Sequence, residues 1–193
     1  MSALLKRREV VAELLADRGE DLLVVPGLGQ PCYDCFAAGD DPRTFYLWGA
    51  MGGAVPVGIG LAVAQPEKRV LVITGDGEML MGLGSLTAAA AEGLPNLAVC
   101  VLDNERYGET GQQQTVTGRG ANLAAIAAGA GFASSKLVTA AADVADGVRL
   151  LREAAGPVFV AFKVDDAPEA PAIPPKDGAH LKTRFRQAVV GKI

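Results

Sequence analysis

The stretch VLVITGDGEMLMGLGSLTAAAAEGLPNLAVCVLDN, residues 70–104, contains the pattern from which the fold follows. Two short runs, residues 70–74 and 97–102, are uncharged and almost wholly apolar, and an Ala-rich stretch of helical length lies between them. Uniformly apolar strands are typical of a sheet that is buried on both faces. Because such strands alternate here with a helix, the pattern predicts a parallel sheet covered by helices on both sides.

The same alternation continues outward from this stretch. Residues 22–25 and 158–162 are further short apolar runs that we interpret as strands. Helices are predicted for five segments, residues 4–18, 52–64, 83–92, 123–129 and 141–153, with Gly19 ending the first. After residue 164 the chain becomes rich in Pro and then basic. We therefore expect one doubly wound α/β domain over residues 1–164, followed by a Pro-rich linker and a short basic C-terminal helix over residues 165–193.

Composition narrows the classes of function. The chain has 193 residues, of which 50% are hydrophobic, so it can bury a core and is not disordered over most of its length. Its net charge of -4 gives no cationic field for nucleic acid or a membrane surface, and we expect neither as a partner. Three Cys and no recognisable secretory leader or membrane span predict a cytoplasmic protein.

Two polar side chains follow the two central strands. Asp76 lies between Gly75 and Gly77 after one strand, and Asn104 follows the next. The carboxyl ends of neighbouring parallel strands meet at one edge of a sheet, where α/β folds bind ligands. Carboxylate and amide oxygens suit Mg²⁺, and the adjacent glycines and helix N-terminus suit a phosphate. The residues themselves thus predict a magnesium and diphosphate site, the alternative being a capping Asp and a turn Asn.

These residues also match a known family. GDG at residues 75–77 followed by Asp103 and Asn104 resembles the signature of thiamin diphosphate enzymes, with Asp103 in place of the first of two Asn. WGAMGG at residues 48–53 and LDNERYGETG at residues 102–111 resemble the sulfopyruvate and phosphonopyruvate decarboxylase branch. The similarity extends over most of residues 4–163 and implies the diphosphate-binding domain of such an enzyme.

The resemblance implies specific roles at the matching positions. Mg²⁺ would be bound by the side chains of Asp76 and Asn104 and by the main-chain carbonyl of Arg106. Two residues would serve catalysis: Gly49, whose carbonyl accepts a hydrogen bond from the aminopyrimidine, and Met51, which supports the bent cofactor. The full set implied to contact thiamin diphosphate is Gly27, Gly29, Gly49, Met51, Gly75, Asp76, Gly77, Glu78, Asn104, Arg106, Tyr107 and Gly108.

Two departures from the family affect the expected site. Glu78 stands where many relatives have a small hydroxyl residue, and its carboxylate would repel the diphosphate unless it turns outward or stabilises the helix N-terminus. The run Gln112 to Gln114 stands where relatives often carry Gly or Asn before a single Gln. The choice of substrate therefore does not follow from the sequence.

One half of the expected active site is absent from this sequence. The family places the activating glutamate on a separate pyrimidine-binding domain, and 193 residues leave no room for a second α/β domain. We expect a partner chain to supply it in a hetero-oligomer, a dimer of dimers or larger, and the isolated chain to be inactive. The expected reaction is decarboxylation of a small anionic 2-oxo acid. A carboligase, an oxidative 2-oxo acid or aldehyde enzyme, and a non-catalytic cofactor-binding subunit remain alternatives.

Two further motifs have simpler interpretations. Cys32 and Cys35 have the spacing of a redox motif, but we expect them to be small residues in a loop. Gly58 and Gly60 could belong to a dinucleotide-binding loop, but no strand precedes them. We expect both of these glycines, Gly58 and Gly60, to allow close helix packing.

Overall fold

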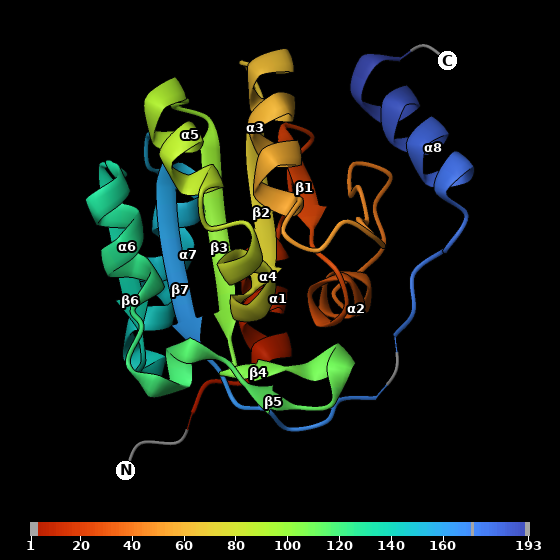
Figure 1. Cartoon of the computed structure of the whole chain (residues 1–193). Coiled ribbons are helices and arrows are strands. Elements are labelled where there is room, and N and C mark those ends of the chain that lie inside the picture. The colour runs from red at the N-terminus through yellow and green to blue at the C-terminus, as the bar shows by residue number, and fades with distance from the viewer. Residues whose placement is uncertain (1–3, 171, 192–193) are drawn as a thin grey trace.

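The structure is a computed structural model that describes residues 4–170 and 172–191. Residues 1–3, 171 and 192–193 belong to the expected domain and tail but lie outside the described residues. The centre of the fold is a five-stranded parallel sheet (Figure 1). Across the sheet its strands are β1 (Leu22–Pro26), β2 (Arg69–Gly75), β3 (Leu97–Asp103), β7 (Val158–Lys163) and β6 (Ser134–Val138).

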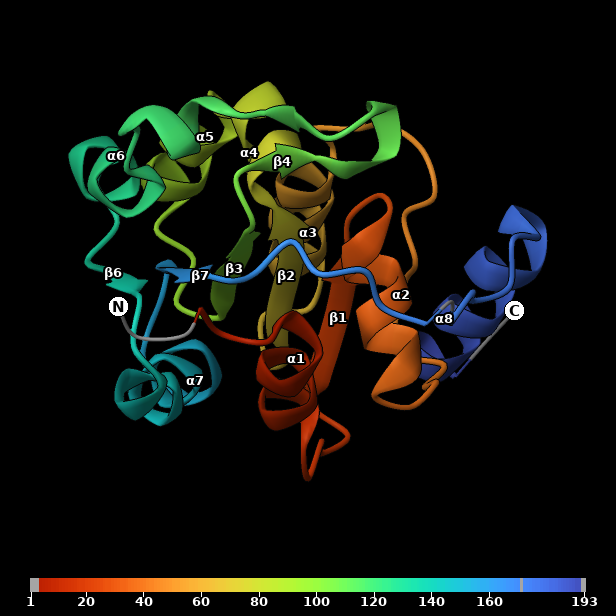
Figure 2. The ribbon, with the colours of Figure 1, turned by 90° about the horizontal axis from the view of Figure 1, so that it is seen from below.

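Helices cover both faces of this sheet, as Figure 2 shows. One face carries α1 (Arg7–Leu15), α2 (Gln30–Ala37) and α7 (Val144–Glu153). The other face carries α3 (Ala54–Ala64), α4 (Asp76–Met81), α5 (Ser85–Glu92) and α6 (Leu123–Ala130). The α/β fold expected from the sequence is thereby confirmed, and the four predicted strands are present with extensions of no more than a residue at either end.

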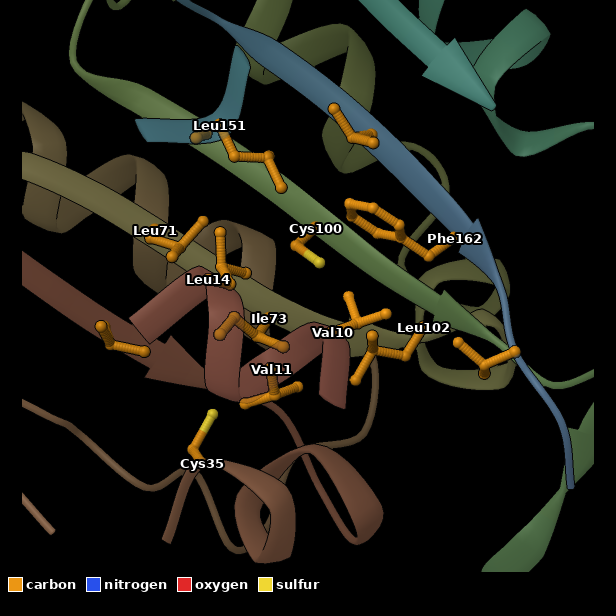
Figure 3. Close-up of a cluster of buried hydrophobic side chains, with 14 of the residues drawn as sticks. Val10, Val11, Leu14, Cys35, Leu71, Ile73, Cys100, Leu102, Leu151 and Phe162 are labelled. Atoms are coloured by element: carbon orange, nitrogen blue, oxygen red, sulfur yellow. The ribbon is translucent and has the colours of Figure 1, made fainter. Parts of the chain in front are cut away.

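The two faces of the sheet form two hydrophobic clusters, because successive side chains of a strand point to opposite sides. Figure 3 shows the cluster on the α1 side, where Val11 and Leu14 of α1 meet Ile73 of β2 and Cys100 of β3. All four side chains are fully buried. Burial of an aliphatic side chain such as Val11, Leu14 or Ile73 contributes roughly 1.5–3 kcal/mol, so this packing holds α1 on the sheet.

Several elements differ from the sequence-based expectation. Residues 4–6 are not helical, because Leu5 instead forms an isolated parallel bridge to Val164, and the first helix ends at Leu15, before Gly19. Strand β6 was not predicted, because it lies at the edge of the sheet and is only half-buried, so it carries no apolar run. The antiparallel pair β4 (Arg106–Tyr107) and β5 (Gln113–Gln114) was also not predicted.

The loop expected at Cys32 and Cys35 is wrong, because both residues lie on helix α2. Pro31 occupies the first turn, where its missing N–H costs no helical hydrogen bond. Both thiols are buried and free, and they pack into the core. The packing interpretation of Gly58 is confirmed, because a Cβ there would lie 2.3 Å from Cγ2 of Val72 on the sheet. The same interpretation of Gly60 is wrong, because nothing in the described part of the chain packs within 4 Å of its Cβ position.

The chain after β7 crosses the carboxyl ends of the strands and leads to α8 (Gly178–Val190) at the β1 edge of the fold (Figure 1). Asp177 caps this helix by accepting hydrogen bonds from the N–H groups of Ala179 at 2.9 Å and His180 at 3.1 Å. The basic C-terminal helix expected from the sequence is therefore present. The division of the chain at residue 164 stays a prediction. None of the helices that the structure describes is both long and apolar enough to cross a bilayer.

Candidate active site

Asp76 and Asn104 lie at the same edge of the sheet. Asp76 begins α4 directly after β2, and Asn104 directly follows β3. These strands are paired neighbours in parallel register, with Gly75 beside Leu102. The side chains are 1% and 9% exposed, respectively, so two hard oxygen donors are held in a largely buried setting. This juxtaposition is the one that the strand pattern predicted.

Two hydroxyl groups surround the Asp76 carboxylate. Thr115 Oγ1 donates a hydrogen bond of 2.6 Å to Asp76 Oδ2, and Thr117 Oγ1 lies 3.2 Å from the same oxygen. Burial raises the pKa of Asp76 to about 6, with the charge of Asp103 adding to it and the two threonines opposing it. Sequence reasoning missed both threonines, because they come from the segment after β5 and only folding brings them to β2.

Asp103 has a charged partner of its own. Lys163 Nζ lies 2.9 Å from Asp103 Oδ2 and 2.7 Å from Glu105 Oε1, and Thr117 Oγ1 donates to Asp103 Oδ1 at 2.8 Å. Asp103 takes the place of a neutral Asn in the expected signature, and the ammonium group of Lys163 at the end of β7 offsets the added charge. The pairing follows from the register of β3 with β7, in which Asp103 lies beside Lys163.

Both polar atoms of the Asn104 carboxamide form hydrogen bonds. Its Nδ2 donates a hydrogen bond of 3.1 Å to Gln30 Oε1. Its Oδ1 accepts one of 3.1 Å from the backbone N–H of Arg106. A carbonyl oxygen has two lone pairs, so Oδ1 retains acceptor capacity. Gln30 was missed by sequence reasoning, which gave it no role.

The donor set fits the expected magnesium ion. Asp76 and Asn104 supply a carboxylate and an amide oxygen, the donor types that Mg²⁺ takes, and both are buried. Within residues 4–170 and 172–191, no cluster of three Cys, His, Asp or Glu side chains forms a metal cage. Mg²⁺ characteristically uses one or two carboxylates together with phosphate oxygens and water rather than such a cage.

A small cavity of about 110 Å³ lies beside these residues. Its lining includes β4 and the following 3₁₀ turn, Gly108–Thr110, a segment that lies at the bottom of Figure 1. Its walls contain six residues that were expected to contact the cofactor: Met51, Gly77, Glu78, Arg106, Tyr107 and Gly108. Five further residues line it: Leu28, Gln30, Pro31, Glu109 and Thr110.

Two of the expected glycines, Gly77 and Gly29, lie close to other side chains. A Cβ on Gly77 would lie 2.6 Å from the ring of Tyr107, and one on Gly29 would lie 2.6 Å from Glu109 Oε1. Gly29 also has a φ of 77°, a backbone angle that residues with a side chain rarely adopt. Gly49 is exposed next to the single tryptophan and is not part of the cavity wall. Gly75 is the last residue of β2 and the N-cap residue of α4.

Of the two arrangements expected of Glu78, the outward-turned one is wrong. The side chain does not turn outward but is buried in the first turn of α4, 4% exposed. Thr74 Oγ1 donates a hydrogen bond of 2.8 Å to Oε2, while Oε1 has no hydrogen-bond partner among the described residues. Burial raises the pKa of this carboxyl group. A Cβ on Gly27 would lie 1.7 Å from Oε2, so Glu78 fills the space that this glycine leaves.

Comparison with known proteins identifies the family. The family described as "Thiamine pyrophosphate enzyme, C-terminal TPP binding domain" matches residues 31–162. The chain belongs to the thiamin diphosphate enzymes. The matched range contains the Asp76 and Asn104 strand ends and most of the cavity wall.

Individual thiamin diphosphate enzymes are similar over different extents. The sulfopyruvate decarboxylase subunit beta of Methanocaldococcus jannaschii is 39% identical over 127 residues, which cover 66% of this chain and 67% of that protein. Phosphonopyruvate decarboxylase of Streptomyces viridochromogenes is 33% identical over 187 residues, which cover 95% of this chain and 46% of that protein. The chain thus spans about two thirds of the first relative and less than half of the second.

Solved structures agree with the fold. The X-ray structure of a thiamin diphosphate-dependent enzyme from Mycobacterium smegmatis superposes with a TM-score of 0.73 at 21% sequence identity. The similarity covers 86% of this chain and 33% of that one. The same sheet and helix layers therefore occur in this solved enzyme as one part of a longer chain.

Proposed function

We propose that this chain is the diphosphate-binding subunit of a thiamin diphosphate- and Mg²⁺-dependent 2-oxo acid decarboxylase, of the sulfopyruvate or phosphonopyruvate type. The single observation that carries the proposal is the pairing of β2 with β3, which puts the buried Asp76 and Asn104 at one edge of the sheet. The decarboxylase names of the two relatives described above support the reaction class.

In the proposed site, each residue of this chain has a physical task. Asp76 and Asn104 would hold Mg²⁺ through oxygen atoms, with the Arg106 carbonyl as a third ligand. The α4 N-terminus would present backbone N–H groups to the diphosphate. When bound, thiamin diphosphate supplies the electron sink that a 2-oxo acid needs to lose carbon dioxide. Met51 and Tyr107, which line the cavity, would exclude water from that region.

The proposal includes a partner chain that carries the pyrimidine-binding half of the site. The subunit name of the Methanocaldococcus relative supports a two-chain enzyme. We expect a hetero-oligomer, a substrate with an anionic end, and no turnover by this chain alone. The cytoplasmic location expected from the sequence and the boundary at residue 164 are kept as parts of the same proposal.

The decisive experiment compares two preparations, the chain purified together with its partner and the chain purified alone. Each preparation is supplied with a panel of 2-oxo acids. We expect thiamin diphosphate and Mg²⁺ to be required, and aldehyde and carbon dioxide to form only when both chains are present. Steady decarboxylation by the isolated chain would overturn the partner requirement.

The same panel distinguishes the alternatives. A product with a longer carbon skeleton would identify a carboligase, and reduction of an added electron acceptor would identify an oxidative enzyme. Binding of thiamin diphosphate without turnover in any reconstituted mixture would identify a non-catalytic subunit. Absence of Mg²⁺-dependent thiamin diphosphate binding would overturn the proposal as a whole.

A further inference from the structure

A carboxamide is an ambiguous metal ligand, because its oxygen and its NH₂ group have nearly the same shape. Only the oxygen of Asn104 can bind a cation, since the NH₂ group is a donor. A rotation of half a turn about the last side-chain bond would replace the ligand by a group that repels the metal. Some feature of the protein must therefore select one orientation.

The structure contains a chain of hydrogen bonds that ends at this carboxamide. Gln30 Oε1 accepts from Asn104 Nδ2 at 3.1 Å and from Arg7 Nη1 at 3.0 Å. Arg7 in turn pairs with Asp34 through its Nε, and through Nη2 at 3.3 Å. The four residues come from α1, from α2 and from the end of β3.

The direction of every bond in this chain follows from the chemistry of Arg7. A guanidinium group has only donors, so the group that Gln30 turns toward Arg7 must be its oxygen. Asn104 contacts that same oxygen and must therefore offer its NH₂ group. The oxygen of Asn104 is then directed away from Gln30, where the backbone N–H of Arg106 meets it.

We propose that Gln30, oriented by Arg7, is a positioning residue that holds the Asn104 carboxamide with its oxygen available to the metal. This inference rests on the proposed function, because it assigns Gln30 a task only if Asn104 binds Mg²⁺. Arg7 is 4% and Asp34 is 1% exposed, and Asp34 is the buried counter-charge of Arg7 while also pairing with Arg8 at 3.2 Å. A buried pair of this kind does not rearrange without leaving an unpaired charge.

The test compares three variants of the full chain, assembled with its partner subunit. Gln30→Met keeps the length of the side chain but removes the acceptor, whereas Gln30→Glu keeps an acceptor for both Arg7 and Asn104. Gln187→Met makes the same change on the exposed surface of α8 and serves as the control. The measurement is thiamin diphosphate binding by equilibrium dialysis over a range of Mg²⁺ concentrations, with the thermal midpoint recorded for each variant.

We expect Gln30→Met to raise the Mg²⁺ concentration for half-maximal binding by about tenfold to a hundredfold, the usual effect of removing a partner of a metal ligand. Gln187→Met should stay within about threefold of the unmodified protein, and Gln30→Glu, which keeps the acceptor, should raise this Mg²⁺ concentration less than Gln30→Met does. If Gln30→Met binds with unchanged Mg²⁺ dependence, the positioning role is wrong. If the unmodified protein binds no thiamin diphosphate at any Mg²⁺ concentration, the proposed function itself fails.

A second pair of variants separates positioning from general stability. Asn104→Asp presents two equivalent oxygens, so orientation no longer matters. In the Asn104→Asp background, we expect Gln30→Met to raise the Mg²⁺ concentration for half-maximal binding by less than about threefold. With Asn104 present, we expect the same substitution to raise it by about tenfold or more. An equal cost in both backgrounds would show that Gln30 acts only through the stability of the fold, and would overturn the inference.

Discussion

The hydroxyl of Thr115 donates a hydrogen bond of 2.6 Å to Oδ2 of Asp76, which lies 39 positions earlier in the chain. Thr115 is 1% exposed, so the bond is shielded from water. It fixes the direction of the carboxylate at the end of β2 and leaves Oδ1 as the oxygen without a side-chain partner among the described residues. Substitution of Asp76 therefore tests its roles in metal binding and in stability.

Asp76→Asn should abolish Mg²⁺-dependent binding of thiamin diphosphate. The substitution keeps the shape of the side chain but removes the only carboxylate of the proposed ligand set, so we expect at least a hundredfold loss of affinity. Equilibrium dialysis with cofactor and Mg²⁺ measures it. Asp17→Asn, at an exposed position, is the matched control and should bind normally. Retained affinity in Asp76→Asn would mean that Asp76 does not hold the metal.

The same variant should be more stable than the unmodified chain at neutral pH when cofactor and metal are absent. The folded-state pKa of Asp76 is raised from 3.8 to about 6, so the folded protein binds the proton more tightly than the unfolded chain does. The cost of the buried charge therefore develops as pH rises from 3.8 to about 6 and is constant above that. At neutral pH, this pKa shift corresponds to a difference in the free energy of unfolding on the order of 2–3 kcal/mol between the two proteins.

Urea unfolding of both proteins at about pH 4 and about pH 7 measures this difference, since the contributions of groups that do not interact with Asp76 cancel between the two chains. The advantage of Asp76→Asn should be present at the higher pH and largely absent at the lower one. An advantage that does not change with pH would contradict the burial of a titrating carboxylate.

Gly27→Ala should destabilise the chain through Glu78. The new methyl group would lie 1.7 Å from Oε2 of Glu78, and forcing the two apart in a packed site costs about 1–3 kcal/mol. Removing the obstructing side chain in the double variant Gly27→Ala with Glu78→Ala should recover part of that cost. Gly84→Ala is the control, because nothing lies within 4 Å of its Cβ position. Additive effects of the two substitutions would show that the residues do not touch.

Asp40→Asn should loosen α8. The Asp40 carboxylate pairs with Arg184 of this helix through two contacts of 2.7 Å and 2.9 Å, in a partly exposed setting, so the loss should be at most about 1 kcal/mol. Hydrogen exchange of the α8 amides measures it. Asp21→Asn removes an exposed ion pair with Lys68 and should leave α8 exchange unchanged.

The Asp40 contact should also weaken in acid. Its hydrogen bonds with Arg184 hold the pKa of Asp40 below the ordinary 3.8, although burial opposes them. The contribution is therefore fully present above pH 3.8 and lost as pH falls through the lower folded value. The expected result is a lower protection factor of the α8 amides in acid, that is, faster exchange relative to the intrinsic rate at the same pH, for the unmodified chain but not for Asp40→Asn.

Much of the fold follows from local pattern. The four strands β1, β2, β3 and β7 are buried on both faces, so their apolar runs mark them in the sequence. Strand β6, with the sequence SSKLV, has no such mark because it is half-exposed at the edge. Helix α2 was missed because Pro31 and two Cys resemble a loop, while its packing against the core decides the conformation.

The strand-end residues Asp76 and Asn104 were predictable, because a parallel sheet brings the carboxyl ends of neighbouring strands together whatever the rest of the chain does. Their partners were not. Thr115 and Gln30 come from separate parts of the chain, and their positions depend on how the segments after β5 and β1 cross the edge of the sheet. Hydrophobic periodicity is a local property and specifies the layers, whereas contacts between distant polar groups exist only once those layers have packed.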